Sequence, residues 1–79
     1  MNDKQQKWHD YVMEYAEPGC EEDARALVNE GCAYQDRGDY DSAYVESVMP
    51  RYEGVIRKDR WENFKAGIER EIDLLNRAG

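Results

Sequence analysis

The chain has 79 residues, which excludes a second independent hydrophobic core, so we expect one domain spanning residues 1-79. Hydrophobic residues make up 41% of it and recur at helical spacings, which excludes intrinsic disorder. The net charge of −7 disfavours direct binding to nucleic acid, because phosphates select lysine and arginine.

The first predicted helix covers residues 4–16. Asn2 or Asp3 is suited to cap its N-terminus. Four apolar residues follow at spacings of three, one and three, which places them on one helix face: Trp8, Tyr11, Val12 and Tyr15. Pro18 disfavours helical geometry in the residue before it and Gly19 follows, so we expect a turn here.

The second predicted helix covers residues 21–37. Its first turn holds Glu21, Glu22 and Asp23, where carboxylates interact favourably with the exposed amides and the helix dipole. Gly38 supplies the left-handed residue that commonly ends a helix. The predicted inward positions are Ala24, Leu27, Val28, Gly31 and Tyr34.

A third helix is predicted to begin at Asp39, as its cap, and to pack back on the second as an antiparallel hairpin, because two residues separate them. Its predicted inward positions are Tyr40, Ala43, Tyr44, Ser47 and Val48. Pro50 either ends or kinks this helix near Val48, or opens a fresh turn as its first residue, and the sequence leaves both open.

The fourth predicted helix is the clearest, and it runs to about Arg77. Asp59 followed by Glu62 is similar to a capping box. The apolar strip of this helix consists of Trp61, Phe64, Ile68, Ile72 and Leu75. The fold class expected from all four patterns is a small all-α bundle of about four helices.

Residues 24-50 resemble a single tetratricopeptide repeat. The resemblance rests on Gly31, Tyr34, Gly38, Tyr40 and Ala43 within the run GCAYQDRGDYDSA. It implies a tetratricopeptide-like helix-turn-helix hairpin in the middle of the bundle, with small residues at Gly31 and Ala43 allowing close approach of two helices and tyrosines filling beside them.

No catalytic, metal-binding or cofactor-binding pattern is present, so we expect no enzyme activity and no cofactor. Cys20 and Cys32 lie twelve residues apart without a CxxC motif, and His9 is the single histidine, which is neither a disulfide framework nor a zinc pattern. We expect free thiols, with Cys32 as a small buried hydrophobe, and a solvated His9. The aspartates around Gly38 do not match a calcium loop.

The N-terminus lacks the apolar run of a signal peptide, and no stretch approaches eighteen consecutive apolar residues. We therefore expect a cytoplasmic protein without membrane contact.

The acidity belongs to the first half of the chain. Residues 1–46 hold twelve acids and four bases, a balance of −8, whereas residues 47–79 hold six acids and seven bases, a balance of +1. The leading hypothesis is a small protein-binding or regulatory domain whose acidic surface meets a basic protein partner. The candidate partner-binding residues are Glu21, Glu22, Asp23, Asp36, Asp39 and Asp41.

Two alternative functions remain open. In the first, the carboxylates mimic nucleic-acid phosphates and inhibit a nucleic-acid-binding protein. In the second, the apolar strip of the fourth helix pairs between copies as a self-associating structural protein, although closure of the monomer's own core is the favoured role of that strip. A basic stretch at Arg51, Arg57, Lys58 and Arg60 is either an intramolecular complement to the acidic half, which is favoured, or a second contact surface.

Overall fold

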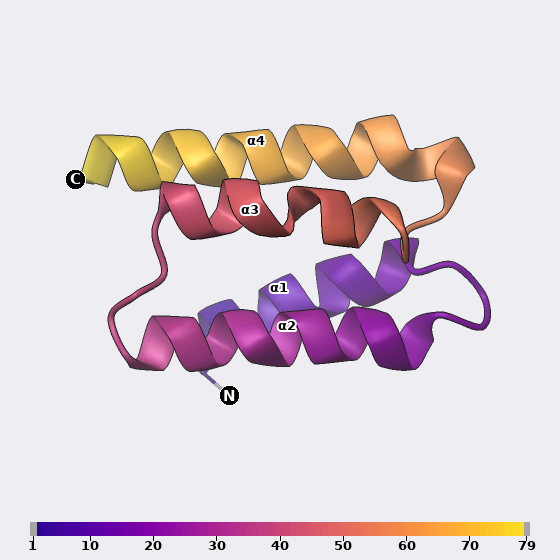
Figure 1. The fold of residues 1–79 in the computed structure, drawn as a ribbon, viewed down its shortest axis with the longest axis horizontal. Coiled ribbons are helices and arrows are strands. Elements are labelled where there is room, and N and C mark those ends of the chain that lie inside the picture. The colour runs from indigo at the N-terminus through magenta and orange to yellow at the C-terminus, as the bar shows by residue number, and fades with distance from the viewer. Residues whose placement is uncertain (1, 79) are drawn as a thin grey trace.

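The computed structural model describes residues 2–78, and this part of the chain folds into four α-helices that run alternately up and down (Figure 1). Their bounds are Asp3–Tyr15 for α1, Glu21–Asp36 for α2, Ser42–Glu53 for α3 and Trp61–Ala78 for α4, and a 3-10 turn, η1, at Lys58–Arg60 precedes α4. The prediction of a small all-α bundle is confirmed.

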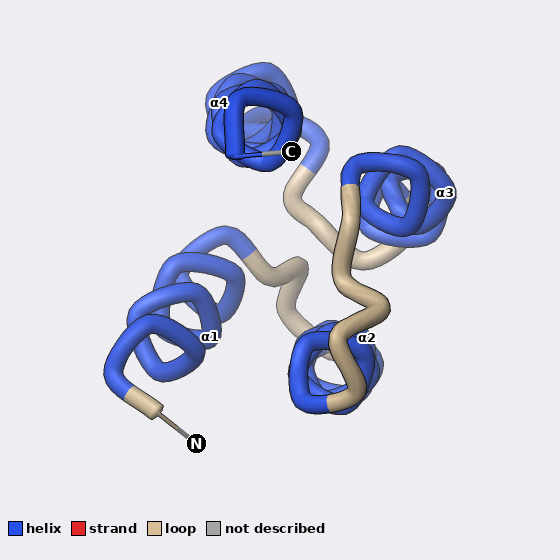
Figure 2. Tube along the Cα trace, turned by 90° about the vertical axis from the view of Figure 1, so that its left-hand side faces the viewer, coloured by secondary structure: helices blue, strands red, loops and turns tan. Residues whose placement is uncertain are grey.

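The bundle is built from two antiparallel hairpins. The backbone of α1 approaches α2 most closely, and that of α3 approaches α4. Seen along the bundle, α1 and α2 form one layer and α3 and α4 the other (Figure 2). The helices α2 and α3 are antiparallel as well, but their tetratricopeptide likeness stays a prediction.

One end of the bundle is tied by backbone hydrogen bonds between the hairpins. The amide of Glu17 donates to the carbonyl of Val55 at 2.9 Å, and the amide of Arg57 donates to the carbonyl of Tyr15 at 2.9 Å. Between them, Ala16 and Ile56 form an isolated β-bridge. Within residues 2–78, no backbone hydrogen bond joins the hairpins at the opposite end, where the α2–α3 connection joins them covalently (Figure 1).

Helix caps follow side-chain chemistry, with two corrections to the predicted positions. Asn2 Oδ1 accepts from the Gln5 amide at 2.8 Å and forms a full capping box on α1. The cap of α3 is Asp41, whose Oδ1 accepts from the Tyr44 amide at 2.8 Å, so the prediction of Asp39 was wrong. Asp59 does not cap α4, because it lies inside η1.

Because the cap of α3 was predicted two residues too early, the residues predicted to face inward were also partly wrong. Ala43 and Ser47 are exposed, and Val48 alone of the predicted set is buried. The buried positions are Val45, Val48 and Tyr52, spaced three and four residues apart. Tyr52 was missed because the sequence left open whether the helix passes Pro50, and it does continue through Pro50 to Glu53.

Pro50 offers a test of this continuous helix. Proline inside a helix removes one backbone hydrogen bond and crowds the preceding turn. Pro50 is exposed, so no tertiary packing depends on its ring. We expect Pro50→Ala to raise the free energy of unfolding by roughly 1 kcal/mol or more, measured by urea titration. A loss of stability would contradict a helix that runs unbroken to Glu53.

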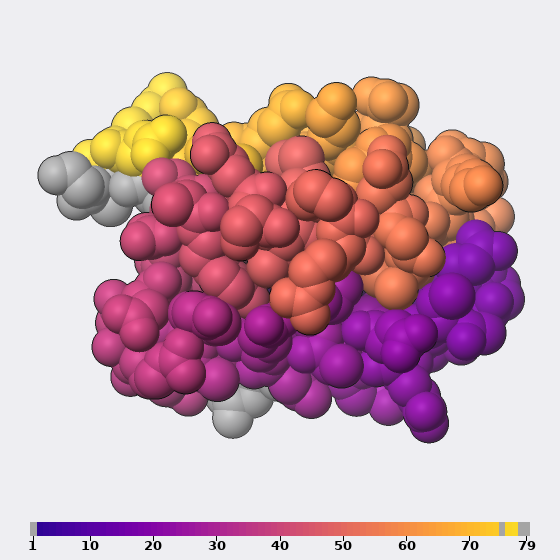
Figure 3. Space-filling model, in the orientation of Figure 1, coloured from indigo at the N-terminus to yellow at the C-terminus, as the bar shows by residue number. Residues whose placement is uncertain are grey.

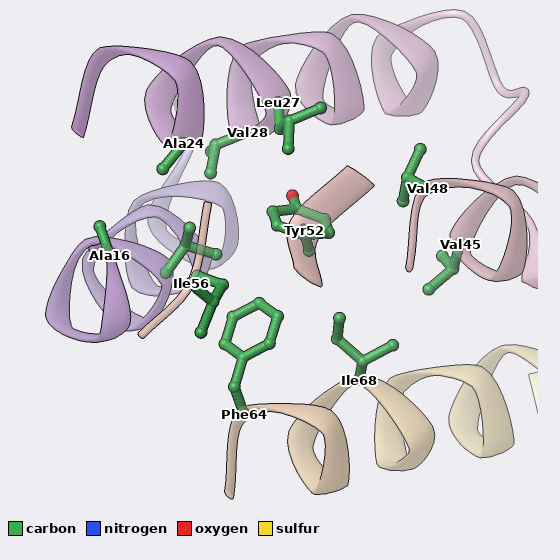
Figure 4. Close-up of a cluster of buried hydrophobic side chains, with 11 residues drawn as sticks. Ala16, Ala24, Leu27, Val28, Val45, Val48, Tyr52, Ile56, Phe64 and Ile68 are labelled. Atoms are coloured by element: carbon green, nitrogen blue, oxygen red, sulfur yellow. The ribbon is translucent and has the colours of Figure 1, made fainter. Parts of the chain in front are cut away.

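The core lies between the two hairpins, and Figure 4 shows its side chains converging from every helix. Phe64 and Ile68 of α4 and Val12 of α1 have no exposed surface. The predicted inward positions of α2 are confirmed, since Tyr34 is half-buried and the others are buried. The apolar strip of α4 packs into this core, with Trp61 and Ile72 half-buried; the Leu75 side chain lies outside the described part.

Helix α4 is longer than α3, 18 residues against 12, and its C-terminal turns extend past the first turn of α3 (Figure 1 and Figure 3). Leu74 lies in this overhang and is 52% exposed. The overhang lies at the end of the bundle where α2 connects to α3 (Figure 1).

Candidate protein-binding surface

The net charge of the protein resides in one hairpin. Residues 1–41, which contain α1 and α2, carry eleven acids and four bases and therefore a charge of −7. Residues 42–79 carry seven acids and seven bases, which cancel. Ten of the eleven carboxylates in the first group are exposed, the exception being the half-buried Glu30. We call α1, α2 and their exposed carboxylates the acidic hairpin.

The six candidate residues form two groups on this hairpin. Glu21, Glu22 and Asp23 lie in the first turn of α2, whereas Asp36, Asp39 and Asp41 surround its other end. Glu22 and Asp36 are separated by about 21 Å along the helix axis, at 1.5 Å per residue. The structure therefore does not bring the six together as a single cluster.

Four of the six carboxylates have structural partners. Glu21 Oε1 accepts from the Gly19 amide at 2.8 Å, and Asp36 Oδ1 accepts from Gln5 Nε2 at 3.2 Å. Asp39 lies 3.3 Å from the Arg37 guanidinium, and Asp41 caps α3. These four carboxylates are nevertheless exposed, as are Glu22 and Asp23, so all six remain accessible to a partner.

The basic stretch complements the acidic hairpin at one point. Arg51 Nη1 of α3 lies 2.8 Å from Glu30 Oε2 of α2, a buried oxygen to which no well-aligned hydrogen bond is made. This ion pair crosses the α2–α3 interface, but Arg51 is largely exposed, so its contribution to stability is small. Arg57 pairs instead with the nearby Asp59 at 3.1 Å.

A pocket of about 220 Å³ opens at the end of the bundle where α2 connects to α3. Seven of its nine lining residues belong to the acidic hairpin, and the other two come from the α2–α3 connection and from α4. They are Lys4, Gln5, Lys7, Trp8, Gly31, Cys32, Gln35, Tyr40 and Glu71. The six candidate carboxylates are not among them.

The shape of this pocket depends on two features of the sequence. Gly31 presents no side chain, and a Cβ there would lie 3.7 Å from the Tyr40 ring. Gln5 is buried, and its Nε2 donates to Gln35 Oε1 at 2.7 Å, which links α1 to α2 beside the pocket. The pocket was not predicted from the sequence. Gln5, a polar residue one turn before Trp8 on the inward face of α1, is the feature of the sequence that could have indicated it.

A hollow of about 560 Å³ lies at the opposite, tied end of the bundle. Four of its six lining residues are charged, namely Glu17, Glu53, Lys58 and Asp59. Its lining is therefore more polar than that of the first pocket. Among residues 2–78, no group of three histidine, cysteine or acidic side chains is arranged to hold a metal ion.

The two cysteines and the single histidine are all half-buried. Cys20 and Cys32 are both free and half-buried, so Cys32 is less buried than predicted. Burial, followed by the nearby Asp36 carboxylate, raises the pKa of the Cys32 thiol, which keeps it protonated at neutral pH. His9 has a 22% exposed side chain, and its Nδ1 lies 3.2 Å from Asp10 Oδ1.

Three tyrosines near the centre make the fold sensitive to alkali. Burial raises the pKa of Tyr44 and of Tyr52 to about 12, and it also raises that of Tyr40. The folded chain thus keeps protons that the unfolded chain loses near pH 10, the ordinary pKa of tyrosine. The stability these residues contribute is complete below about pH 10 and is lost as the pH rises toward 12.

We therefore expect cooperative unfolding between pH 10 and about 12, measured by circular dichroism together with tyrosinate absorbance. Tyr44→Phe should make stability less dependent on pH in this range. Ionisation of all tyrosines near pH 10 without loss of helix would contradict the packing described.

No protein-family model matches the chain, and neither the curated proteins nor the solved structures contain a significant match. No helix within residues 2–78 is long and apolar enough to cross a membrane. The acidic hairpin and its pocket are therefore the features that bear on function.

Proposed function

We propose that the protein is a small non-catalytic protein-binding domain, located in the cytoplasm, whose acidic hairpin binds a basic surface of a protein partner. The observation that carries this proposal is the confinement of the whole net charge of −7 to residues 1–41, with ten exposed carboxylates. Such a one-sided field attracts a basic partner, speeds association and orients it before contact.

The spacing of the carboxylates favours a folded protein partner over nucleic-acid mimicry. Phosphates follow one another along a DNA strand at about 3.4 Å of helix rise. On α2, Glu30 is the one acid between Asp23 and Asp36, and it is half-buried and paired with Arg51. A continuous phosphate-like ladder is thus missing from the longer helix of the acidic hairpin.

The location of the α4 strip also bears on self-association. Phe64 and Ile68 are fully buried inside the monomer, so they are not free to pair with a second copy. This favours a partner other than the protein itself.

Two charge-matched variants test the proposal. The first replaces Glu14, Glu17 and Glu22 of the acidic hairpin by glutamine, and the second replaces Glu53, Glu62 and Glu69 of the other hairpin in the same way. All six side chains are exposed, and each triplet includes one residue in the first turn of a helix, so both variants should fold alike.

Each protein is immobilised and used to capture partners from nuclease-treated lysate of the source organism, with washes of rising salt. We expect a stoichiometric basic partner on the wild type and on the second variant, and about tenfold weaker retention on the first, since a tenfold loss needs only about 1.4 kcal/mol. Equal retention on both variants would contradict the proposal. Displacement of the partner by added DNA or RNA would instead favour mimicry.

A further inference from the structure

The pocket between α1, α2 and α4 has the size and lining of a receptor for one side chain. We infer that it binds a single large apolar side chain, such as leucine or phenylalanine, presented by a partner segment whose neighbouring residues are basic. This inference rests on the proposed function and adds to it the residue class that anchors the partner.

The volume selects the kind of occupant. Pockets for drug-sized ligands usually measure about 300–1,000 Å³, whereas a cavity of about 150 Å³ takes up benzene. At about 220 Å³, this pocket is too small for most metabolites and large enough for one aromatic or branched aliphatic side chain. Anchor side chains that fill pockets of this kind carry most of the energy in many protein interfaces.

The chemistry of the lining selects an uncharged anchor. Trp8, Gly31, Cys32 and Tyr40 supply aromatic, thiol and backbone surface, and the exposed area of the pocket is predominantly apolar. The Trp8 ring is held in place by stacking on Tyr11, with centroids 5.3 Å apart. Burial of a leucine or phenylalanine side chain against such a surface is favourable, because it removes apolar area from water.

The charges around the pocket determine what flanks the anchor. Lys4, Lys7 and Glu71 line the pocket, and the two lysines outweigh the one carboxylate in repelling a cationic side chain that enters it. Two exposed carboxylates lie just beyond: Asp36, which is hydrogen-bonded to Gln5 of the lining, and Asp39, next to Tyr40 in the chain. The complementary segment therefore has an apolar side chain for the pocket and basic side chains beside it.

The test uses three capped peptides of sequence Lys-Lys-X-Lys-Lys, with leucine, phenylalanine or alanine at X. Fluorescence of Trp8 reports binding in a Trp61→Phe background, which leaves one tryptophan, because the chain has two. We expect the leucine and phenylalanine peptides to bind about tenfold more tightly than the alanine peptide, the preference that apolar burial predicts.

A variant that fills the pocket and a matched control show whether the preference for an apolar side chain arises in the pocket. Cys32→Phe places a ring in the pocket and should abolish the preference, while Ala33→Phe, on the exposed side of α2, should retain it. If Cys32→Phe does not fold by circular dichroism, alkylation of Cys32 with N-ethylmaleimide in a Cys20→Ser background fills the same space.

The possible outcomes distinguish a failure of the pocket inference from a failure of the proposed function. Equal, salt-sensitive binding of all three peptides would overturn the pocket and leave the acidic hairpin supported. An apolar preference unaffected by salt and by Asp36→Asn combined with Asp39→Asn would support the pocket and contradict the attraction of basic residues by the acidic hairpin. Absence of binding by all three peptides would overturn the pocket.

Discussion

Phe64→Ala is expected to cost about 3–5 kcal/mol of unfolding free energy, the range for loss of a buried aromatic ring. The stability of a domain of this length is itself roughly 4–12 kcal/mol at 0.05–0.15 kcal/mol per residue. The loss is therefore about a quarter of the total stability or more. Phe64 has this effect because its fully buried ring lies within an aromatic cluster that joins α4 to α1 and α3.

The geometry of that cluster explains why no neighbour can replace the ring. The Phe64 centroid lies 5.5 Å from Tyr11, 5.4 Å from Tyr52 and 5.8 Å from Trp61. Removing the ring leaves a cavity at the contact between the two hairpins, where the backbones of α1 and α4 approach each other less closely than those within each hairpin.

Urea unfolding followed by circular dichroism measures the loss. Leu74→Ala is the control on the same helix, and its change should stay within about 0.5 kcal/mol because Leu74 is 52% exposed. A Phe64→Ala loss no larger than that of Leu74→Ala would mean that the ring is not central to the core.

Gly67→Ala is expected to destabilise the protein by about 1–3 kcal/mol, although alanine is the better helix former. Gly67 faces Tyr11, and a Cβ at this position would lie 2.8 Å from Tyr11 Cζ and closer still to the hydroxyl oxygen. The Tyr11 hydroxyl donates to the Phe64 carbonyl at 3.2 Å and its ring stacks on Phe64, so it does not move away without loss of both contacts.

Gly67→Ala should become stabilising once the Tyr11 side chain is removed. In a Tyr11→Ala background, Gly67→Ala should stabilise by roughly 0.5–1 kcal/mol, because helix propensity alone then remains. A double-mutant cycle of urea titrations gives the coupling between the two residues. Independent, additive effects would contradict the close approach of α1 and α4 at this point.

Much of the fold follows from local patterns in the sequence. The inward faces of α1 and α2 were predictable because their apolar spacing is regular and each helix has clear boundaries. The inward face of α3 was not predictable, since either of two aspartates could cap this helix and Pro50 could end it. Which capping residue is used depends on how α3 packs against α4, and the local sequence does not contain that information.

The candidate surface was predictable only in part. The charge bias of the first half is visible in composition, but its coincidence with one hairpin depends on which helices pair. The separation of Glu22 from Asp36 was predictable, because both lie in the predicted helix over residues 21–37. The pocket arises where α1, α2 and α4 meet, from Trp8, Gly31 and Glu71, which are far apart in the chain.

The most direct test of the central claim is an NMR footprint of the captured partner on the isotope-labelled 9.3 kDa protein. The account predicts that amide shifts and line broadening concentrate on residues 3–41, including Glu22, Asp23 and the residues around the pocket, and that they weaken with salt. A footprint centred on the outer faces of α3 and α4, with the acidic hairpin unperturbed, would contradict it.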